Sequence, residues 1–319
     1  MSDPGIERAL VLGSTGFLGS HLVAHLESLG VETLCVGGPR TGNQGGVTEN
    51  SAGAAAGGRR PPDRYLDIRD LAEVGKLMRD VKPTHVFHLA AVRNRGAAPE
   101  DLSSSVEVNV NGSANVAACS ANSGVERLVI AGTAEEYGSI AVPFVESADE
   151  HPVTTYGISK MLATHASLAC GEMMALPVAV LRISVAYGPG QSETSLFGGL
   201  VSALSQGRHF AMSLGNQTRD FVWAGDVADA LVRAALAPDA AGTIVNLGSG
   251  FPITVAEAAR TVAAAAGREE LLGIGELPLR KGEAVEYTLD LSKCRKVLGW
   301  TPPTTLDDGV RMMLAAEGL

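Results

Sequence analysis

Residues 9–19 read Ala-Leu-Val-Leu-Gly-Ser-Thr-Gly-Phe-Leu-Gly, an apolar run followed by three glycines spaced three apart. The apolar run predicts a buried strand, and the glycines let the backbone turn tightly into a helix that we expect to end near Leu29, before Gly30. The N–H groups at such a helix N-terminus attract an anion. Gly13, Gly16 and Gly19 would then share a tight turn, a close approach to a pyrophosphate, and helix packing. The stretch predicts a phosphate site, with an ordinary glycine-rich turn as the alternative.

Short apolar runs recur along the next 170 residues, separated by helix-like segments. They cover residues 33–36, 85–89, 128–131 and 178–183. Alternation of this kind predicts an α/β fold with a doubly wound parallel sheet, the Rossmann fold. Ligands of such sheets bind at the carboxyl ends of the strands, so we expect the functional residues there.

After Ile183 the alternation becomes irregular. We expect residues 1–185 to form a dinucleotide-binding domain to which 220–250 return. Residues 186–219 and 251–319 would form a smaller, discontinuous substrate-binding lobe. Residues 37–62 are rich in Gly, Ala and Asn and predict a mobile surface loop.

Composition narrows the function classes. The 319 residues are 45% hydrophobic, enough for a substantial core, and the net charge of −10 disfavours nucleic-acid backbones and anionic membranes as partners. Four widely spaced cysteines suit unpaired thiols in a reducing compartment. The N-terminus lacks a basic segment leading into an apolar one, and no apolar run is long enough to span a bilayer, so we expect a cytoplasmic protein. His85 and His88 would point to opposite faces of a strand, so no metal site is expected.

Tyr156 and Lys160 are four residues apart, so a helix would place them on one face. A phenol titrates near pH ~10, and a nearby ammonium would stabilise the phenolate so that Tyr156 could act as an acid or base near neutrality. Upstream, residues 128–138 predict a strand that runs out into a turn, which would bring the Thr133 hydroxyl to the sheet's carboxyl edge. One carbonyl oxygen could accept hydrogen bonds from both the Thr133 and the Tyr156 hydroxyl. The alternative is that the Tyr-x-x-x-Lys spacing arises by chance.

Further motifs accompany these in a fixed order. They are Leu66-Asp67-Ile68, His88-Leu-Ala-Ala91, Asn109-Val-Asn-Gly112, Thr133 four before Tyr137, Leu181-Arg182, Tyr187-Gly-Pro-Gly190, Arg219-Asp-Phe-Val222, Asn246-Leu-Gly-Ser-Gly250 and Arg280-Lys-Gly-Glu283. With the glycine run and Tyr156/Lys160, they make the chain resemble an extended short-chain dehydrogenase/reductase of the nucleotide-sugar epimerase, dehydratase and ketoreductase group. The resemblance covers nearly the whole sequence.

The resemblance implies a role for each matching residue. Tyr156 would be the general acid/base, Lys160 would hold the nicotinamide ribose and lower the tyrosine pKa, and Thr133 would hydrogen-bond the reacting oxygen. The implied substrate-binding residues are Thr133, Glu135, Arg219 and Arg280, with both arginines on the diphosphate. The implied cofactor-binding residues, besides Tyr156 and Lys160, are Gly13, Thr15, Gly16, Phe17, Leu18, Gly19, Arg40, Asp67, Ile68, Leu89, Ala90, Ala91 and Asn109.

Each of these roles has a structural alternative. Asp67, expected at the adenine, could instead cap a helix, and Asn109, expected near the nicotinamide half, could fill a turn or a buried polar niche. Either arginine could be a solvated surface charge. A homodimer built from two helices per subunit is expected by resemblance only.

Cofactor preference depends on the end of the second strand. Gly37 stands where a member of the group that prefers NAD would usually carry an acid for the adenosine ribose. Arg40 follows shortly and could accept a 2′-phosphate, with Arg59 and Arg60 assisting. We therefore favour NADP(H), while NAD(H) remains possible and an exposed loop arginine is the structural alternative.

The favoured reaction is the NADPH-dependent reduction of the C4 ketone of a nucleotide-linked 4-keto-6-deoxyhexose, with Tyr156 protonating the alkoxide. The run Glu135-Glu136-Tyr137-Gly138 resembles that of such reductases. The alternative is an NAD-dependent nucleotide-sugar 4-epimerase. A 4,6-dehydratase is less favoured because Ala134 replaces one of its acids, although Glu135 matches another. Val185 stands where the group commonly has a diphosphate-binding Asn. A protein that senses NAD(P) without catalysis is a hypothesis of a different class, which the intact Tyr156/Lys160 pair disfavours.

Overall fold

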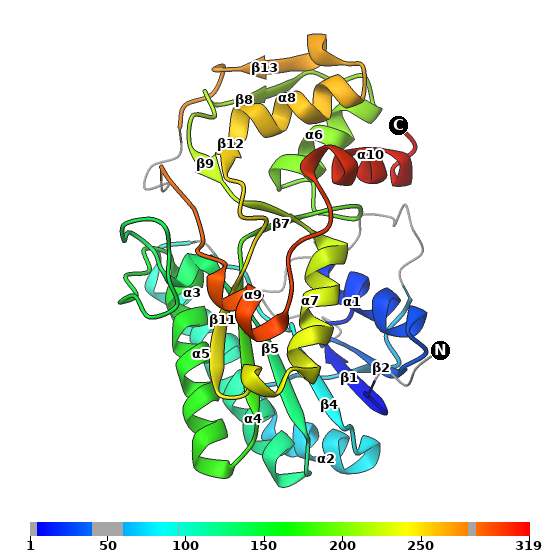
Figure 1. Cartoon of the computed structure of the whole chain (residues 1–319), viewed down its shortest axis with the longest axis vertical. Helices are drawn as coiled ribbons and strands as arrows, with labels where there is room; N and C mark the ends of the chain where they lie inside the picture. Colours follow the sequence, from blue (N-terminus) through cyan, green and yellow to red (C-terminus); the bar gives the residue numbers. More distant parts are fainter. Residues whose placement is uncertain (1–4, 40–59, 95, 280–284) are drawn as a thin grey trace.

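The computed structural model describes residues 5–39, 60–94, 96–279 and 285–319, and within these ranges seven parallel strands form the central sheet. The strand order is β11-β6-β5-β4-β1-β2-β3, and every neighbouring pair is parallel (Figure 1). The strands are β1 (Arg8–Leu12), β2 (Glu32–Gly37), β3 (Arg64–Tyr65), β4 (His85–His88), β5 (Arg127–Thr133), β6 (Val178–Ile183) and β11 (Thr243–Leu247). The predicted doubly wound parallel sheet is confirmed.

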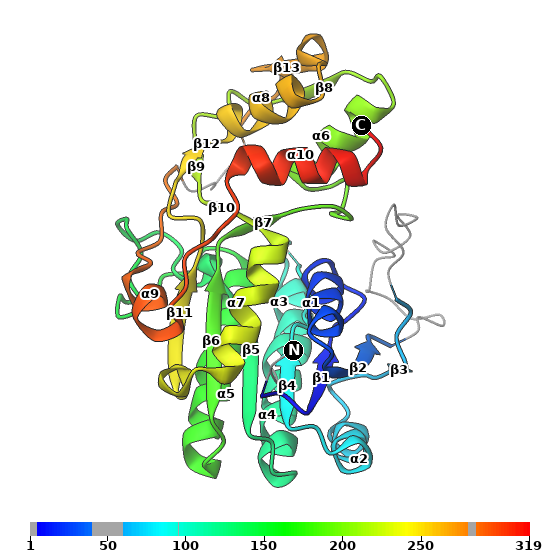
Figure 2. The same cartoon turned by 45° about the vertical axis from the view of Figure 1, so that its right-hand side comes forward.

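The strands read as continuous apolar runs because both faces of the sheet are covered. Leu10, Val11 and Leu12 of β1 are each at most 1% exposed. Val11 faces a core shared with α1 (Phe17–Ser28) and α7 (Ala224–Leu236). Leu10 and Leu12 face the opposite core, to which α2 and α4 contribute. Figure 2 shows helices on both sides of the strands.

Further helices complete the two layers. On the face of Leu10 lie α2 (Leu71–Val81), α4 (Gly112–Asn122) and α5 (Thr155–Met174), and α3 (Pro99–Ser105) lies between α2 and α4 along the chain. Short turns of other helical types occur at η1 (Val106–Asn111, π-helical), η2 (Ala134–Glu136), η3 (Pro238–Ala240) and η4 (Glu269–Leu271). The helix predicted after the glycines ends at Ser28, and Gly30 follows with a φ of +78°.

A second group of short elements lies beyond the carboxyl ends of the strands, at the top of Figure 1. Three two-stranded pairs and three helices have a hydrophobic core of their own, which includes Tyr187, Phe197 and Val310. The helices are α6 (Leu196–Ser205), α8 (Val255–Ala265) and α10 (Leu306–Ala316). The strand pairs are β7 (Val185–Tyr187) with β10 (Phe221–Trp223), β8 (Phe210–Met212) with β13 (Leu272–Ile274), and β9 (Thr218–Arg219) with β12 (Ile253–Thr254). The division into two domains stays a proposal.

Two strands of the central sheet were missed at the sequence level. β3 has only two residues and β11 lies within the irregular part of the chain, where it pairs with β6. α9 (Ser292–Leu298) packs against β11 from the C-terminal part of the chain. Of the loop predicted over 37–62, Gly37 closes β2, and 40–59 lie outside the described residues. No helix within the described ranges is long and apolar enough to cross a membrane.

Candidate active site

The three glycines of the opening motif meet different surroundings. Gly13 has a φ of +86°, and a Cβ added there would lie 2.6 Å from the backbone nitrogen of Ala90. A Cβ on Gly19 would overlap the carbonyl oxygen of Gly13. A Cβ on Gly16 would approach only that same oxygen, at 3.2 Å. Gly13 and Gly19 therefore serve close packing, whereas Gly16 keeps space open in front of the helix.

The N-terminus of α1 is free of internal anions. Gly16 is its N-cap and supplies no side-chain cap, and its first turn, which contains Phe17 and Leu18, has no acidic residue. A helix N-terminus that lacks these groups leaves N–H donors for an external anion. The space beside Gly16 and these donors fit a dinucleotide's pyrophosphate.

The ends of β1 and β4 meet beside this turn. The Leu89 N–H donates to the carbonyl oxygen of Leu12 at 2.9 Å, and Ala90, just before Ala91, is the residue against which Gly13 packs. Thr15 lies beside Gly37 of β2, since a Cβ on Gly37 would lie 3.3 Å from the Thr15 Cγ2. The structure thus gathers these predicted cofactor residues at one edge of the sheet.

Asp67 and Ile68 lie at the far end of the same edge, after β3. Asp67 accepts hydrogen bonds from the Arg69 guanidinium, which holds the pKa of that carboxyl below its usual value. A shallow surface depression is lined by Asp67, Arg69, Asp70, Glu107 and Asn111. Asp67 does not cap α2, because Asp70 accepts the Glu73 N–H there. Its role at an adenine remains a proposal.

Tyr156 and Lys160 both belong to α5, whose first turn is capped by Thr154. The Lys160 side chain is only 3% exposed, and burial lowers the pKa of its ammonium while the nearby Glu136 carboxylate raises it. Among the described residues, the Lys160 ammonium has no hydrogen-bond or ion-pair partner. A buried ammonium of this kind fits the hydroxyls of a cofactor ribose, so the residues present suit the dinucleotide that the cradle around Gly16 indicates.

Thr133 is the last residue of β5, at the carboxyl edge as predicted from the sequence. Its hydroxyl accepts the Glu135 N–H at 3.2 Å, and its own N–H donates to Glu136 Oε1 at 2.8 Å. Thr133 is therefore held at both its backbone and its side chain where the strand turns toward α5.

Glu135 lies beside the start of α5. Its Oε2 accepts from the Thr154 hydroxyl at 3.2 Å, and its Oε1 lies 3.4 Å from Arg93 Nη2. The Arg93 guanidinium carbon is 5.8 Å from the centroid of the Tyr156 ring. Arg93 was missed at the sequence level, because nothing in its position after β4 distinguishes it from an ordinary surface arginine.

Asn109 is fully engaged inside the protein. Its side chain bonds the backbone N–H and carbonyl of Val92 at 2.8 and 2.9 Å and donates to the Ser159 hydroxyl at 2.9 Å. These contacts are those of the buried polar niche weighed as its alternative, and they join the loop after β4 to α5. His88 is buried nearby and hydrogen-bonded to Ser113, and burial, with the Lys160 charge, lowers its pKa to about 3.

Arg219 of β9 and Tyr287, which is buried in the core that the sheet shares with α1 and α7, lie together. Arg219 donates to the Thr218 carbonyl at 2.6 Å, and its guanidinium carbon lies 5.5 Å from the centroid of the Tyr287 ring. Tyr287 is 8% exposed, and burial, together with the Glu135 charge, raises the pKa of its phenol well above its usual value. Tyr287 was missed because it follows the predicted motif at 280–283 without a pattern of its own.

Some predicted residues are not brought to the site by the described structure. Arg40, Arg59 and Arg280 lie outside the described residues. Arg60 is described, and its guanidinium pairs with Glu27 at 2.6 Å and with Asp63 at 2.8 Å. Its charge is thus already matched by two carboxylates.

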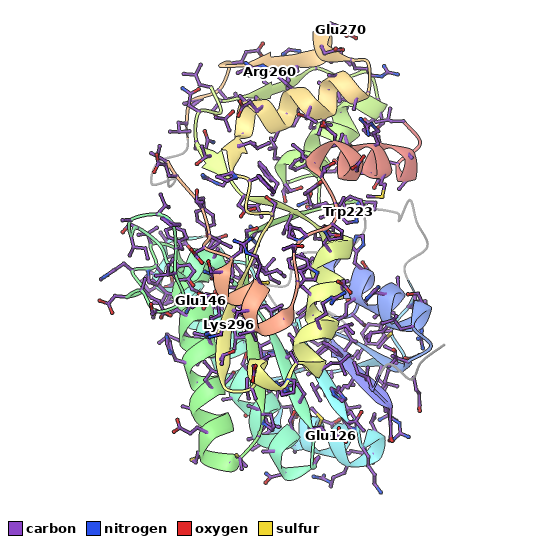
Figure 3. All side chains as sticks on the ribbon, viewed as in Figure 1. Glu126, Glu146, Trp223, Arg260, Glu270 and Lys296 are labelled. Atoms are coloured by element: carbon purple, nitrogen blue, oxygen red, sulfur yellow. The ribbon has the colours of Figure 1, made fainter. Side chains whose placement is uncertain are left out.

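An aromatic cluster joins α1 to the second group of elements. His21 of α1 lies 5.3 Å from the Phe17 ring and 6.5 Å from the Trp223 ring, and its Nε2 is 3.2 Å from the Pro189 carbonyl oxygen. Figure 3 labels Trp223 between the sheet and the upper elements. The N-terminal half of α1 therefore packs against the second group of elements.

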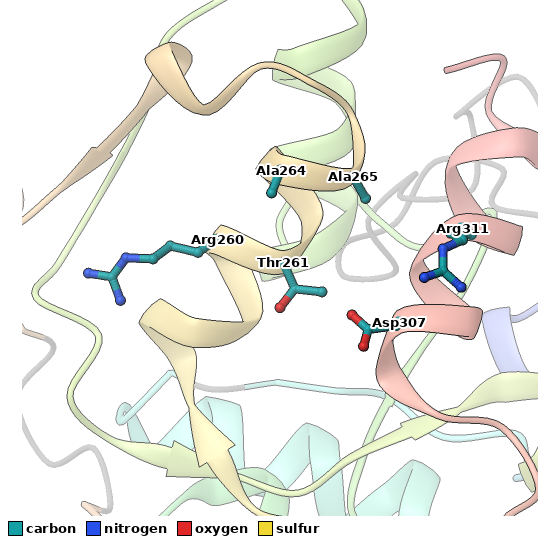
Figure 4. Close-up of a pocket in the computed structure, with 6 residues that line it drawn as sticks. All are labelled: Arg260, Thr261, Ala264, Ala265, Asp307 and Arg311. Atoms are coloured by element: carbon teal, nitrogen blue, oxygen red, sulfur yellow. The ribbon is translucent and has the colours of Figure 1, made fainter.

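A larger cleft, of about 450 Å³, lies between α8 and α10. Figure 4 shows Thr261 and Asp307 facing each other across it, while Arg260 points away from Arg311. None of the predicted site residues lines it. We therefore place the candidate active site at the carboxyl edge of the sheet.

Comparisons with known proteins identify the family. Residues 9–248 match the NAD dependent epimerase/dehydratase family. The chain is 29% identical to the UDP-glucose 4-epimerase of Mycolicibacterium smegmatis over 315 residues, which cover 95% of this chain and 96% of the relative.

Two solved structures extend the comparison. The structure of the Thermus thermophilus UDP-glucose 4-epimerase in complex with NAD is 28% identical, with a TM-score of 0.82 over 98% of this chain and 99% of that chain. The structure of DesIV, the dTDP-glucose 4,6-dehydratase of Streptomyces venezuelae, with NAD and TYD bound, is 27% identical, with a TM-score of 0.81 over 97% and 96%.

Proposed function

The chain belongs to the NAD-dependent epimerase/dehydratase family, and from that premise we propose that it is a nucleotide-sugar 4-epimerase. It is an enzyme of the extended short-chain dehydrogenase/reductase class. The epimerase is preferred over the ketoreductase favoured from the sequence because relatives over nearly the full length of the chain are 4-epimerases.

The observation that carries the proposal is the meeting of three features at one sheet edge. Tyr156 and Lys160 share the first turns of α5, Thr133 ends β5 beside them, and the glycine cradle lies at the end of β1. An acid/base, a hydroxyl for the reacting oxygen and an anion site are the groups that oxidation and reduction of a sugar hydroxyl require.

When bound, a nicotinamide dinucleotide would supply the hydride acceptor and donor. Gly16 and the N–H groups of α1 would hold its pyrophosphate, and Lys160 its ribose. Tyr156 would take the proton of the sugar's C4 hydroxyl during oxidation and return a proton to the same oxygen during reduction, when hydride would reach the opposite face of the C4 carbonyl. The Lys160 ammonium would stabilise the phenolate, Thr133 would orient the reacting oxygen, and Arg219 would pair with the sugar nucleotide's diphosphate.

We propose NAD(H) as the cofactor. Two similar structures contain NAD, and Arg60, one of the side chains expected to assist with a 2′-phosphate, is paired with Glu27 and Asp63. The absent acid at Gly37 favours NADP(H), which remains the alternative. Separate titrations with NADH and NADPH, followed by fluorescence, test the choice. Tighter binding of NADPH by tenfold or more would overturn it.

A 4-ketoreductase is the second candidate. The run Glu135-Glu136-Tyr137-Gly138 and the absent acid at Gly37 favour it. The placement of Glu135 at the start of α5, where it accepts from the Thr154 hydroxyl, suits a substrate contact in either reaction. A 4,6-dehydratase is less favoured, since Ala134 lacks the acid needed to assist loss of a hydroxyl.

We also propose a homodimer formed through α4 and α5. Leu162 and Met173 of α5 are 40% and 78% exposed. The helix therefore presents apolar side chains to solvent in the monomer, which a second subunit could cover. Light scattering at micromolar concentration checks this, and a monomer would contradict it.

The enzyme assay separates the candidate reactions. The purified protein is incubated with UDP- and dTDP-hexoses without added cofactor, and the C4 configuration is followed by NMR. Separately, NADPH is added with 4-keto-6-deoxyhexose nucleotides, and absorbance is followed at 340 nm. Interconversion of C4 epimers supports the proposal. NADPH oxidation without any epimerisation would replace it with the ketoreductase, and cofactor binding without either activity would favour a sensor.

A further inference from the structure

A charged cluster lies beneath the candidate site, centred on Arg182 of β6. The side chains of Arg182 and Glu136 are both 0% exposed, and Arg182 Nε donates to Glu136 Oε2 at 2.8 Å. Arg182 Nη2 also pairs with Glu150, whose side chain is 11% exposed. Two carboxylates thus share one guanidinium, which leaves one surplus negative charge in the cluster, and Glu136 is the carboxylate that is closed to water.

The surroundings of Arg182 do not supply the missing cation. Its guanidinium carbon lies 4.5 Å from the centroid of the Tyr137 ring. Tyr137 donates to Asn246 Oδ1 at 2.6 Å, and burial raises the pKa of its phenol to about 12, so it is neutral at physiological pH. His165 pairs with Glu150 at 2.6 Å, but its side chain is 56% exposed. The pair of His165 and Glu150 therefore forms the solvent end of the cluster, where water screens the Glu150 charge.

The missing positive charge lies on α5. Lys160 is buried and, among the described residues, has no ion-pair partner, and the turn η2 that carries Glu136 packs against α5. Glu136 is the carboxylate whose charge acts on Lys160. His88 of β4, which is neutral, also lies near Lys160, and Tyr156 precedes Lys160 by four residues on α5. Arg182, which belongs to β6, contacts the Glu136 carboxylate.

Glu136 also contacts Thr133, the other residue expected to act together with Tyr156. Its second oxygen, Oε1, accepts the Thr133 N–H at 2.8 Å. An isolated buried charge costs several kcal/mol, and a fixed opposite charge nearby offsets much of that cost. Glu136 therefore interacts electrostatically with Lys160 and through a hydrogen bond with Thr133, while its own side chain stays fully buried.

We propose that Glu136 is a positioning residue that provides the counter-charge for the Lys160 ammonium and, with its second oxygen, fixes the end of β5 at Thr133. One buried carboxylate thereby keeps Lys160 charged at the pH where Tyr156 works. The consequence for catalysis rests on the proposed function, whereas the charge balance itself does not.

The test measures the ionisation of Lys160 directly in the full chain without substrate. The chain has six lysines, so 13Cε-lysine labelling gives a simple NMR spectrum, and Lys160→Arg identifies the Lys160 signal. The titration is run on the wild type and on Glu136→Gln. We expect the Lys160 midpoint to fall by about one pH unit or more in Glu136→Gln, because the opposite charge is lost while the burial remains.

Glu150→Gln is the matched control. It also removes one carboxylate from Arg182 and leaves one donor without an acceptor, so both variants should lose comparable thermal stability. Its charge is screened at the solvent end, so the Lys160 midpoint should move by no more than a few tenths of a pH unit. An unmoved midpoint in Glu136→Gln, or equal shifts in both variants, would overturn the proposal.

A second variant keeps the test informative if Glu136→Gln alone does not fold. Glu136→Gln combined with Arg182→Met removes both members of the buried pair, a change that proteins often tolerate better than the loss of one member. The Lys160 midpoint should again fall. If the midpoint falls but no epimerase or reductase activity exists in the wild type, the charge balance stands and the proposed function fails.

Discussion

The two halves of the candidate site are built in different ways. The half at the end of β1 is made of backbone: Gly13 packs on the Ala90 nitrogen, and the N-terminus of α1 carries no side-chain cap. The half above the sheet is made of side chains, with Arg219 stacked on Tyr287 and held by the Thr218 carbonyl. Backbone shape tolerates few residue types, whereas side-chain contacts admit many.

This difference explains which roles each half can take. A rigid turn that only glycine can form suits a cofactor whose pyrophosphate is the same in every member of a family. Side chains carried on strands of two or three residues can change without disturbing the sheet, which suits variable sugars and nucleotides. Tyr156 belongs to α5, a helix packed against the sheet, and we propose that it serves both halves.

The largest effect is expected where the halves meet. Tyr156→Phe should lower turnover by about 10²–10⁴-fold, because the proton transfer loses its acid/base group. The cofactor half does not depend on this hydroxyl, so NADH affinity should stay within about twofold. Steady-state kinetics and NADH fluorescence measure the two quantities. A variant that keeps most of its turnover would remove Tyr156 from the mechanism.

Substitutions of two glycines in one motif test the roles assigned to the backbone half. Gly13→Ala places a Cβ 2.6 Å from the Ala90 nitrogen at a φ of +86°, so it should lower the free energy of unfolding by about 2–4 kcal/mol. Gly16→Ala has a φ of −71° and more space, so it should cost about 1 kcal/mol or less and instead weaken NADH binding. Urea denaturation measures both. Equal losses of stability would contradict the division of roles.

Beneath the backbone half, His88 should make stability depend on pH. Its pKa is lowered to about 3 by burial and by the Lys160 charge, whereas an unfolded histidine titrates near 6.5. The unfolded chain therefore takes up a proton below pH ~6.5 that the folded chain does not, so this stability is present above that pH and is lost as the pH falls toward 3. His88 alone should cost about 2 kcal/mol between pH 7.5 and 5. The control is His88→Gln, whose unfolding free energy should fall less over that range. Parallel curves for the two proteins would be inconsistent with a buried neutral His88.

The side-chain half should give a smaller and more selective effect. Arg219→Gln should weaken binding of UDP or dTDP by about tenfold, since a charge-assisted hydrogen bond to phosphate is lost. NADH affinity should not change. Calorimetric titration with each ligand separates the two outcomes, with Arg208→Gln as a control on an exposed arginine of the same group of elements. A loss of NADH binding in Arg219→Gln would place Arg219 in the wrong half.

The backbone half was also the more predictable one. The glycine spacing predicted the turn, and the end of α1 was placed to within a residue of Leu29. The spacing of Tyr156 and Lys160 predicted a shared helix because helical periodicity depends only on local sequence. Thr133 followed from the length of the apolar run before it.

The side-chain half depended on contacts between distant segments, which no local pattern encodes. Arg93 reaches Glu135 across 42 positions, and Asn109 bonds Ser159 across 50. Tyr287 joins the site only because its segment runs beside β9, where Thr218 N–H bonds the Val285 carbonyl. The pairing of Arg60 with Glu27 and Asp63 was unforeseen for the same reason.

The most direct test follows the hydrogen at C4 of the sugar. A UDP-hexose deuterated at C4 is incubated with the purified protein without added cofactor, beside Tyr156→Phe, and the products are analysed by NMR and mass spectrometry. The account predicts a C4 epimer that retains its deuterium, formed by the wild type and not by the variant. An epimer that exchanges its deuterium with solvent, or equal conversion by Tyr156→Phe, would contradict it.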